Sequence, residues 1–221
     1  MTNKQGKLIV VEGGDFSGKS TFIDKIKQAY PMFKYTREPG NKLDTHNSEE
    51  CEEIRNTLLT QDLSIESEAF LFAKSRELHT KDIIDLINNG YNVICDRYIL
   101  SSFAYQAYAG GLEYADVLKE NKQVLQSLDR HGIEINILLF QLNKENYAIR
   151  KALREQSHGL DAIEQKGEEF FSRVNEFFNT DICISYLPEE ASINIYRIDA
   201  NQSIEDVYNQ GEQIIKEIIN N

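Results

Sequence analysis

The stretch Gly13-Gly14-Asp15-Phe16-Ser17-Gly18-Lys19-Ser20 decides the fold of this chain, and it comes just after the apolar run Leu8-Ile9-Val10-Val11. The spacing Gly-x4-Gly-Lys-Ser, entered from a strand and left through a helix, is typical of a loop whose backbone N–H groups surround phosphates. The alternative is a glycine-rich turn that carries Lys and Ser by coincidence. Both flanking elements are those that a phosphate-binding loop requires, so we predict a nucleotide site.

Each residue type in this loop has a chemical reason to be there. Gly13 and Gly18 permit backbone angles that a Cβ forbids. Lys19 offers a positive charge to the β- and γ-phosphates, and Ser20 offers a hydroxyl to Mg²⁺. The helix that starts near Gly18 adds the positive end of its dipole. The loop therefore predicts nucleotide binding without saying which reaction follows.

Length and composition favour one globular domain. The chain has 221 residues, 41 % of them hydrophobic, and no repeat or low-complexity segment. We interpret residues 1–221 as a single α/β domain. No apolar run approaches the roughly 18 residues that a membrane span needs. The N-terminal residues lack the apolar core of a secretory signal, so we expect a cytoplasmic protein without a membrane partner.

The net charge of −12 argues against polymeric nucleic acid as a partner, because phosphate backbones require a basic surface. Positive charge is instead concentrated beside motifs, at Lys19, Arg37, Arg76, Arg97, Arg150 and Arg154. The three cysteines are far apart and lack CxxC spacing, which indicates neither a disulfide framework nor a zinc site.

Apolar runs alternate with amphipathic stretches along the whole chain. We predict strands at 7–12, 33–36, 91–95, 135–140 and 193–198. We predict helices at 18–30, 49–60, 65–89, 98–108, 114–131, 144–154, 164–181 and 203–219. Strands separated by helices imply a five-stranded parallel sheet covered on both faces, with ligands at the carboxyl ends of the strands.

Three further motifs predict a second phosphorylated substrate. Thr36-Arg37-Glu38-Pro39-Gly40 ends the second strand, Phe72-Ala73-Lys74-Ser75-Arg76 lies on a long helix, and Asp96-Arg97-Tyr98 ends the third strand. Phe72 and Arg76 share one helix face, where an aromatic ring can stack on a base and a guanidinium can donate to a base carbonyl. The plain alternatives are a core aromatic for Phe72 and a strand-end ion pair for Asp96 and Arg97.

These motifs together resemble the thymidylate kinase family, whose members use ATP to phosphorylate dTMP. The resemblance spans almost the whole chain and rests on the following segments: Glu12–Ser20, Thr36–Gly40, Ile54-Arg55, Glu68 through Phe72 to Arg76, Asp96-Arg97-Tyr98, Ser101–Gln106, Leu160–Glu164 and Ile198-Asp199-Ala200. It implies the three-layer fold of P-loop NTPases with a short lid at about residues 150–163. It also implies a homodimer, for which no sequence feature can be isolated.

The resemblance also implies roles for individual residues. It assigns ATP to Gly13, Gly14, Asp15, Phe16, Ser17, Gly18, Lys19, Ser20, Thr21, Arg150 and Ala200. It assigns dTMP to Asp15, Arg37, Phe72, Arg76, Arg97, Ser102, Tyr105, Gln106 and Asp161. We predict Ser20 and Asp96 as metal-binding residues for Mg²⁺, and Lys19, Arg97, Arg150 and Arg154 as catalytic.

Within the acceptor set, the resemblance implies finer roles. Arg37 and Arg97 would hold the acceptor phosphate, and Asp15 would contact the sugar 3′-hydroxyl. Phe72 would stack on thymine, while Arg76 would donate to its O4 carbonyl. Ser102, Tyr105 and Gln106 would line the base and the deoxyribose.

The lid arginines resemble those of the bacterial branch of the family, and Phe16 agrees, because the other branch carries arginine at that loop position. The chain also departs from the family. Asn41-Lys42-Leu43 replaces the usual Gly-Thr after Gly40, Leu78 stands where glutamine is usual, and Gln141 stands where aspartate is usual. We therefore expect a different local loop after Gly40.

The chemistry needs no side-chain base, because a phosphate monoester with a second pKa near ~6 is mostly dianionic at neutral pH. One alternative function is a kinase for another pyrimidine, such as dUMP or a 5-modified dUMP. A deoxynucleoside kinase would call for a base, and Arg37 favours a phosphate acceptor instead. A regulatory GTPase usually shows Asn-Lys-x-Asp, whereas Asn143-Lys144-Glu145-Asn146 lacks the aspartate.

Overall fold

The structure is a computed structural model that describes residues 4–155, 163, 166–189 and 191–220. Its five strands form one all-parallel sheet in the order β2-β3-β1-β4-β5. The strands are β1 (Leu8–Gly13), β2 (Lys34–Arg37), β3 (Val93–Asp96), β4 (Ile135–Gln141) and β5 (Ile193–Asp199). The predicted α/β sandwich with a five-stranded parallel sheet is confirmed.

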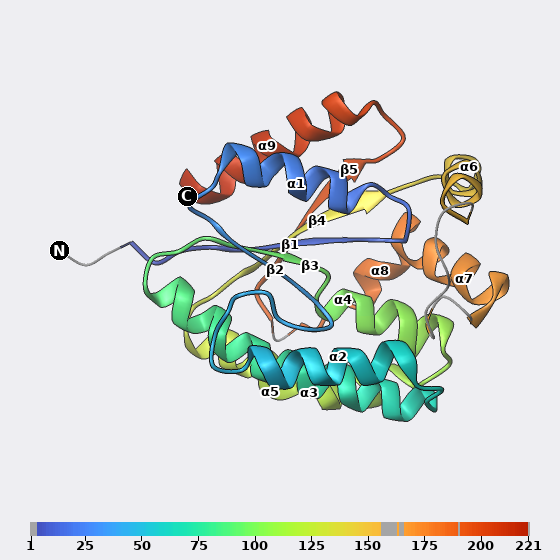
Figure 1. Cartoon of the computed structure of the whole chain (residues 1–221), viewed down its shortest axis with the longest axis horizontal. Coiled ribbons are helices and arrows are strands. Elements are labelled where there is room, and N and C mark those ends of the chain that lie inside the picture. The colour runs from blue at the N-terminus through green and yellow to red at the C-terminus, as the bar shows by residue number, and fades with distance from the viewer. Residues whose placement is uncertain (1–3, 156–162, 164–165, 190, 221) are drawn as a thin grey trace.

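Helices cover both faces of this sheet. On one face lie α1 (Lys19–Ala29) and α9 (Ile204–Asn220), and on the other lie α3 (Ile65–Asn88), α4 (Ile99–Ser102) and α5 (Tyr114–Arg130), with α2 (Ser48–Thr60) packed on α3 (Figure 1). The other helices within the described residues are the π-helix η1 (Phe103–Ala109), α6 (Lys144–Glu155), α7 (Glu168–Asn179) and α8 (Ile182–Ser185).

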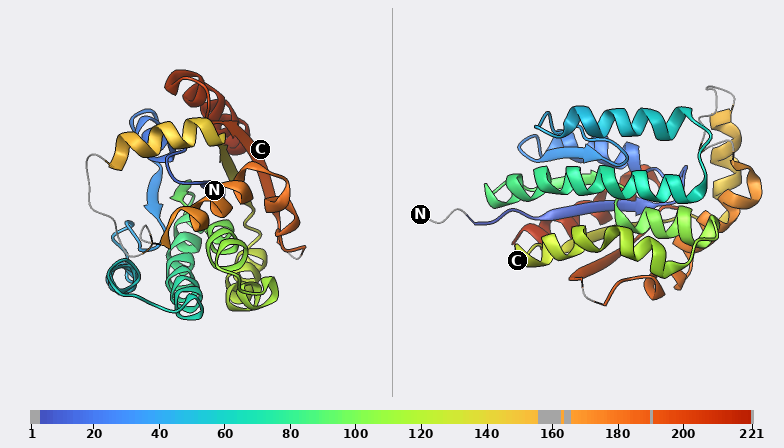
Figure 2. Two further views of the ribbon diagram at one scale, coloured as in Figure 1. Left: turned by 90° about the vertical axis from the view of Figure 1, so that its right-hand side faces the viewer. Right: turned by 90° about the horizontal axis from the view of Figure 1, so that it is seen from below.

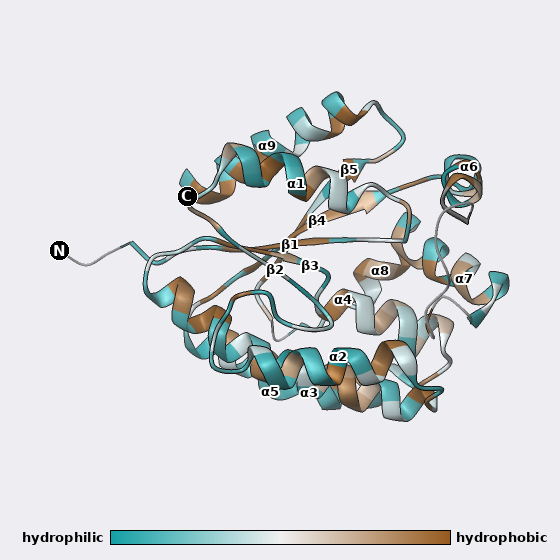
Figure 3. Cartoon of the chain, viewed as in Figure 1, coloured by the Kyte–Doolittle hydropathy of each residue, from teal (hydrophilic) through white to brown (hydrophobic). Residues whose placement is uncertain are grey.

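The central strand β1 shows why two layers of helices form. Its residues alternate between two buried clusters. Leu8 and Val10 pack with α3 and α5, whereas Ile9 and Val11 pack with α1 and α9. All six residues of β1 are buried, and its first four are apolar, so the strand is covered on both faces, as parallel sheets require. The central strands β1 and β4 are accordingly mostly hydrophobic, and hydrophilic residues lie on the outer sides of the helices (Figure 3).

The carboxyl ends of the strands point toward α6 and α7, at the right of Figure 1, and the left view of Figure 2 looks onto this end. In open parallel sheets, ligands bind at the carboxyl ends of the strands. Part of the predicted lid at residues 150–163 lies outside the described residues. Among the described helices, none is both long enough and apolar enough to cross a bilayer.

Two predicted helices differ from the structure beyond their ends. The helix predicted at 98–108 divides into α4 and the π-helix η1, whose wider turn sequence periodicity does not reveal. The helix predicted at 164–181 begins only at Glu168, because Gly167 has φ 89°, and it ends at Asn179 before the separate α8. The other predicted elements agree within two residues.

Candidate active site

The phosphate loop has the strand-loop-helix geometry that its sequence predicts. Gly13 has φ 146°, and a Cβ there would lie 2.5 Å from the carbonyl oxygen of Phe140. Gly18 has φ 90° and precedes α1, whose first turn receives no side-chain cap among the described residues. The free backbone N–H groups of that turn are therefore available to an anion.

Lys19 lies over its own loop. Its Nζ donates to the carbonyl oxygens of Gly13 at 3.0 Å and Gly14 at 2.7 Å, and it lies 3.4 Å from Ser17 Oγ. Burial and the nearby Arg97 guanidinium lower the pKa of Lys19 to about 8. An anionic phosphate would favour the charged form of this ammonium.

Two cavities open at this end of the sheet. The first measures about 220 Å³ and is lined by Asp15, Arg37, Glu38, Pro39, Arg55, Leu59, Phe72, Arg76, Asp96, Arg97, Tyr98, Ser101, Ser102, Tyr105, Gln106 and Ile163. The second measures about 910 Å³ and is lined by Asp15, Phe16, Ser17, Gly18, Lys19, Ser20, Thr21, Phe22, Arg55, Asp96, Arg97, Arg150, Leu153, Ala200, Gln202, Ile204 and Val207. We call them the acceptor cavity and the donor cavity.

Most predicted site residues come together in these cavities. The acceptor cavity holds every residue predicted for dTMP except Asp161, which lies outside the described residues. The donor cavity holds the residues predicted for ATP except Gly13 and Gly14, whose carbonyls face Lys19. The side chain of Arg154 also lies outside the described part of the chain.

Arg97 lies where the two cavities meet. Its guanidinium forms an ion pair with Asp15 and donates to the Gly13 carbonyl at 3.1 Å and to Ser101 Oγ at 3.3 Å. Burial opposes its charge, but Tyr105 and Asp15 beside it raise the pKa of Arg97. Burial likewise opposes ionisation of Asp15, yet Arg97 and Lys19 lower the pKa of that carboxyl. Arg97 is therefore a permanent cation between the two cavities.

Asp15 also accepts from the Tyr105 hydroxyl at 2.9 Å, and the Arg97 guanidinium lies 5.3 Å from the centre of the Tyr105 ring. Burial raises the pKa of Tyr105 well above its usual value, so its hydroxyl stays protonated and donates. This contact orients Asp15 and the aromatic wall of the acceptor cavity together.

Arg76 is more deeply embedded than its predicted role requires, because only 1 % of the residue is exposed. It donates to Glu38 at 2.7 Å, Asn121 at 2.6 Å, Ser102 at 3.0 Å and the Tyr98 carbonyl at 3.2 Å. These contacts use four of its five N–H groups, so one remains for a base carbonyl at the cavity wall.

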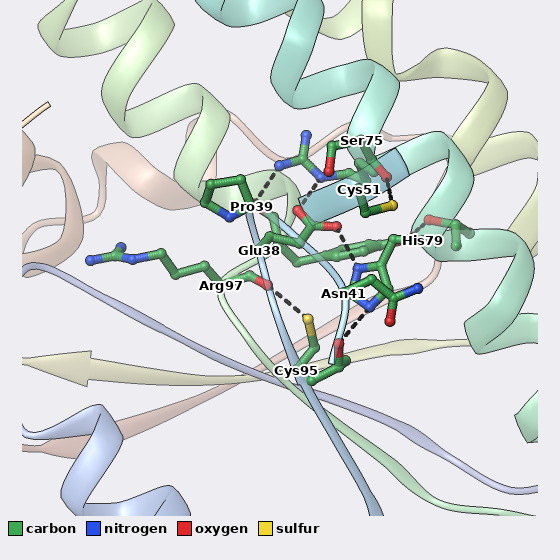
Figure 4. A network of polar contacts seen from close by, with 12 residues as sticks. Glu38, Pro39, Asn41, Cys51, Ser75, His79, Cys95 and Arg97 are labelled. Atoms are coloured by element: carbon green, nitrogen blue, oxygen red, sulfur yellow. Dashed lines mark hydrogen bonds and ion pairs between the residues drawn. The ribbon is translucent and has the colours of Figure 1, made fainter. Parts of the chain in front are cut away.

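Glu38 is the centre of this buried network, shown in Figure 4. It accepts from Arg76 and lies 3.3 Å from His79 Nδ1, whose Nε2 is 2.8 Å from Thr36 Oγ1. The Glu38–Pro39 peptide bond is cis. The network fixes the end of β2 against α3, which are the two elements that carry Arg37 and Phe72.

Arg37 forms an ion pair with Glu52, at 2.9 Å, and Glu52 also accepts from the backbone N–H of Asn41 at 2.9 Å. The loop after Gly40 is anchored further by Asp82, which accepts from Asn41 at 2.8 Å. This chain's replacement for Gly-Thr is thus a hydrogen-bonded loop held by α2 and α3.

Arg150 connects α6 to the donor cavity. It donates to the Phe16 carbonyl of the phosphate loop at 3.2 Å and to the Ala200 carbonyl after β5 at 2.7 Å. Sequence reasoning placed all three residues near ATP, and the structure brings them into contact.

Arg55 is the residue that sequence reasoning left without a role. It lines both cavities and donates to the Pro39 carbonyl at 2.8 Å. Ile54-Arg55 is one of the segments that resemble the family, but Arg55 lies on α2, far along the sequence from the phosphate loop and from Asp96-Arg97. Its place between the cavities therefore appears only in the fold. Leu153 and Ile204 were also missed, and they line the donor cavity although they are 67 % and 61 % exposed.

The residues predicted for Mg²⁺ fit that ion as part of a shared site. Ser20 and Asp96 line the donor cavity, and Asp96 Oδ1 is buried without a hydrogen-bond partner among the described residues. In the described part of the chain, no group of three or more His, Cys, Asp or Glu residues could hold a metal alone. Phosphate oxygens and water would have to supply the other ligands.

A loop for one polyphosphate and a cation-lined cavity for a second anion therefore open side by side. The family model described as thymidylate kinase matches residues 11–210. The chain belongs to the thymidylate kinase family. It is accordingly a nucleoside monophosphate kinase, a phosphotransferase.

Relatives that are thymidylate kinases match over nearly the whole chain. The thymidylate kinase of Finegoldia magna is 33 % identical over 95 % of this chain and 97 % of its own length. That of Acholeplasma laidlawii is 34 % identical over 91 % of this chain and 94 % of its own length. That of Halalkalibacterium halodurans is 29 % identical over 96 % of this chain and 97 % of its own length. The residues that the family model matches include those that line both cavities.

Proposed function

We propose that this chain transfers the γ-phosphoryl group of ATP to dTMP, giving dTDP and ADP. The observation that carries the proposal is the junction of the two cavities. Asp15, Arg55, Asp96 and Arg97 line both of them, so the two nucleotides would meet end to end at these residues. The larger cavity, beside the phosphate loop, suits the triphosphate, and the smaller one suits the monophosphate.

The residues around the junction perform the chemistry by positioning and by charge. The acceptor phosphate is already a nucleophile at neutral pH, so transfer requires in-line alignment and neutralisation of the equatorial oxygens. Lys19 would hold the β- and γ-phosphates, and Arg37 and Arg97 the acceptor phosphate. Mg²⁺, held by Ser20 and Asp96, would neutralise phosphate charge when bound. Arg150, with Arg154, would bring positive charge from the lid.

The acceptor cavity would select the base. Phe72 would stack on thymine, and the remaining N–H of Arg76 would donate to O4. Ser102, Tyr105 and Gln106 line the rest of the wall, and the resemblance assigns Asp161 to the same substrate. A site built to donate to a carbonyl leaves donors unpaired when it is offered cytosine.

Three finer predictions belong to this proposal. The chain would act as a homodimer in the cytoplasm, and residues 150–163 would close over ATP during transfer to exclude water. None of them is needed for the assignment of the two cavities.

An ADP-release assay over a panel of dTMP, dUMP, 5-modified dUMP, dCMP and dGMP tests the proposal. We expect dTMP to give the highest kcat/KM, with no turnover when Mg²⁺ is chelated. A higher kcat/KM for dUMP or a 5-modified dUMP would establish the alternative acceptor. The similarity to thymidylate kinases favours dTMP instead. Absence of ADP release with every monophosphate would contradict the proposal.

A further inference from the structure

Glu12 is a buried carboxylate that the mechanism above does not use. It is 0 % exposed, lies in β1 directly before the phosphate loop, and is not among the residues that line the two cavities. Burying a carboxylate is unfavourable unless hydrogen bonds compensate the loss of hydration. Burial raises the pKa of Glu12, while Arg97 and three hydrogen bonds oppose that change.

The three hydrogen bonds all come from the segment that follows β3, with Tyr98 in the turn and Ser101 in α4. The backbone N–H groups of Tyr98 and Ser101 donate to Oε1 of Glu12 at 2.7 Å and 3.1 Å. The Ser101 hydroxyl donates to Oε2 at 2.7 Å. Glu12 therefore holds the segment that immediately follows Arg97.

Arg97 has an unusual backbone in this turn. Its φ is 67°, a left-handed conformation that is unfavourable for a residue with a Cβ. Consecutive residues of β1 fix the amides on both sides of its Cα. The Val11 carbonyl accepts from Arg97 N–H at 3.0 Å, and Glu12 accepts from Tyr98 N–H. The Cys95 thiol also donates to the Arg97 carbonyl at 3.0 Å (Figure 4).

The same carboxylate acts on the Arg97 side chain through Ser101. Because the Ser101 hydroxyl donates its proton to Glu12, its lone pairs remain for the Arg97 Nη1, which lies 3.3 Å away. In Figure 4 the Arg97 side chain extends away from the Glu38 network. Its position thus depends on its own turn and on the contacts with Ser101, Gly13 and Asp15.

We propose that Glu12 is a positioning residue for phosphoryl transfer, which holds Arg97 in its left-handed conformation and aims its guanidinium at the junction of the two cavities. This inference rests on the proposed function, because Arg97 is the cation that would hold the acceptor phosphate there. Glu12 itself touches no substrate and acts only through Arg97.

The test is Glu12→Gln, which keeps the size of the side chain but can donate to Ser101 Oγ and turn its hydroxyl toward Arg97. We expect kcat for dTMP to fall on the order of tenfold or more, since small misplacements of a charge-stabilising group have effects of this size. KM for ATP should stay within about twofold, because the phosphate loop keeps its own contacts. Wild-type kcat in folded Glu12→Gln overturns the inference.

A double-mutant cycle separates positioning from plain stability. In an Arg97→Ala background, Glu12→Gln should lower kcat no further, because the residue through which it acts is gone. An equal loss in both backgrounds overturns the inference. Asp82→Asn is the matched control. Asp82 is another buried carboxylate held by neutral donors, so its amide should lower the thermal midpoint and leave kcat unchanged.

If Glu12→Gln does not fold, Ser101→Ala carries the test. It removes only the hydroxyl arm, so kcat should fall by a few-fold while the thermal midpoint changes little; unchanged kcat overturns the inference. The two proposals fail separately. A wild-type protein that releases no ADP with any monophosphate refutes the proposed function. An active wild type with an insensitive Glu12 refutes only the positioning role.

Discussion

Arg37 and Asp96 are register partners at the carboxyl ends of β2 and β3, and each keeps one buried polar atom without a hydrogen-bond partner among the described residues. The atoms are Nε of Arg37 and Oδ1 of Asp96. A buried polar atom left unpaired costs about 1–3 kcal/mol, so we expect ligand groups to satisfy both. For Arg37 Nε, which belongs to a side chain lining the acceptor cavity, we expect this partner to be the acceptor phosphate.

Arg37→Ala should therefore raise KM for dTMP by about tenfold or more, because charge-assisted hydrogen bonds to phosphate are strong. KM for ATP should change little, since Arg37 lines the acceptor cavity and not the donor cavity. Steady-state kinetics with each substrate varied in turn measures both. Arg197→Ala is the matched control, because Arg197 also pairs with a carboxylate but lies outside both cavities. Equal effects of the two variants would contradict the assignment.

Lys19 should make nucleotide binding depend on pH. Its pKa is about 8 because of burial and Arg97, and bound phosphates would raise it. Below pH 8 the ammonium is charged both free and bound, so no proton is taken up. As pH rises through 8, the free protein loses the proton, ATP affinity falls, and binding takes up a proton. Calorimetric titrations in buffers of different ionisation enthalpy measure this uptake, and Lys19→Met should abolish it.

The lowered pKa of Lys19 also determines how its charge affects the free energy of unfolding at each pH. A lysine whose pKa falls on folding binds its proton less well in the folded state. Its charge therefore opposes folding fully below pH 8, and this cost is relieved as pH rises toward the unfolded value of 10.5. At pH 7, Lys19→Met should thus unfold at an equal or higher temperature while losing phosphoryl transfer. A clearly lower midpoint would contradict this.

The sequence was informative where a feature depends on local pattern. The strand, loop and helix around Gly18 follow from spacing and periodicity, and so does the parallel sheet. It was not informative where a feature depends on contacts between distant segments. The burial of Arg76 depends on Glu38, Ser102 and Asn121, which lie 26 to 45 positions from it, and the left-handed backbone of Arg97 has no sequence signature.

Arg76 should contribute to both base choice and stability. Arg76→Gln leaves the buried Glu38 carboxylate without its ion-pair partner, which should cost on the order of 3–5 kcal/mol of unfolding free energy. It should also lower kcat/KM for dTMP more than for dCMP, because the longer, charged guanidinium that would donate to O4 is lost. Denaturant unfolding and substrate competition measure the two effects. Lys74→Gln, on the same helix with a surface ion pair, should change neither. Unaltered discrimination in a folded Arg76→Gln variant would remove its role at the base.

The lid arginines should act on kcat. Arg150 bridges the Phe16 and Ala200 carbonyls, so its loss separates α6 from the phosphate loop as well as removing a cation. We expect Arg150→Ala and Arg154→Ala each to lower kcat on the order of tenfold or more, with the double variant lower still. Lys144→Ala, a cation at the start of the same helix, should keep the wild-type value. Wild-type kcat in all three arginine variants would show that transition-state charge comes from elsewhere.

Leu153 and Ile204 should bind the donor base by apolar contact. They are large, mostly exposed aliphatic side chains, yet both line the donor cavity, one from α6 and one from the start of α9. An aromatic base placed against them would bury apolar surface that is otherwise in water. Leu153→Asp should therefore raise KM for ATP about tenfold, through lost burial and repulsion from the triphosphate, and should leave KM for dTMP unchanged. Met32→Asp is the matched control, since Met32 is 77 % exposed and lies outside both cavities.

Because the aliphatic contacts of Leu153 and Ile204 carry no hydrogen-bond pattern, dATP and GTP should also serve as phosphoryl donors. A strict requirement for ATP in the wild type would mean that polar groups read the base instead.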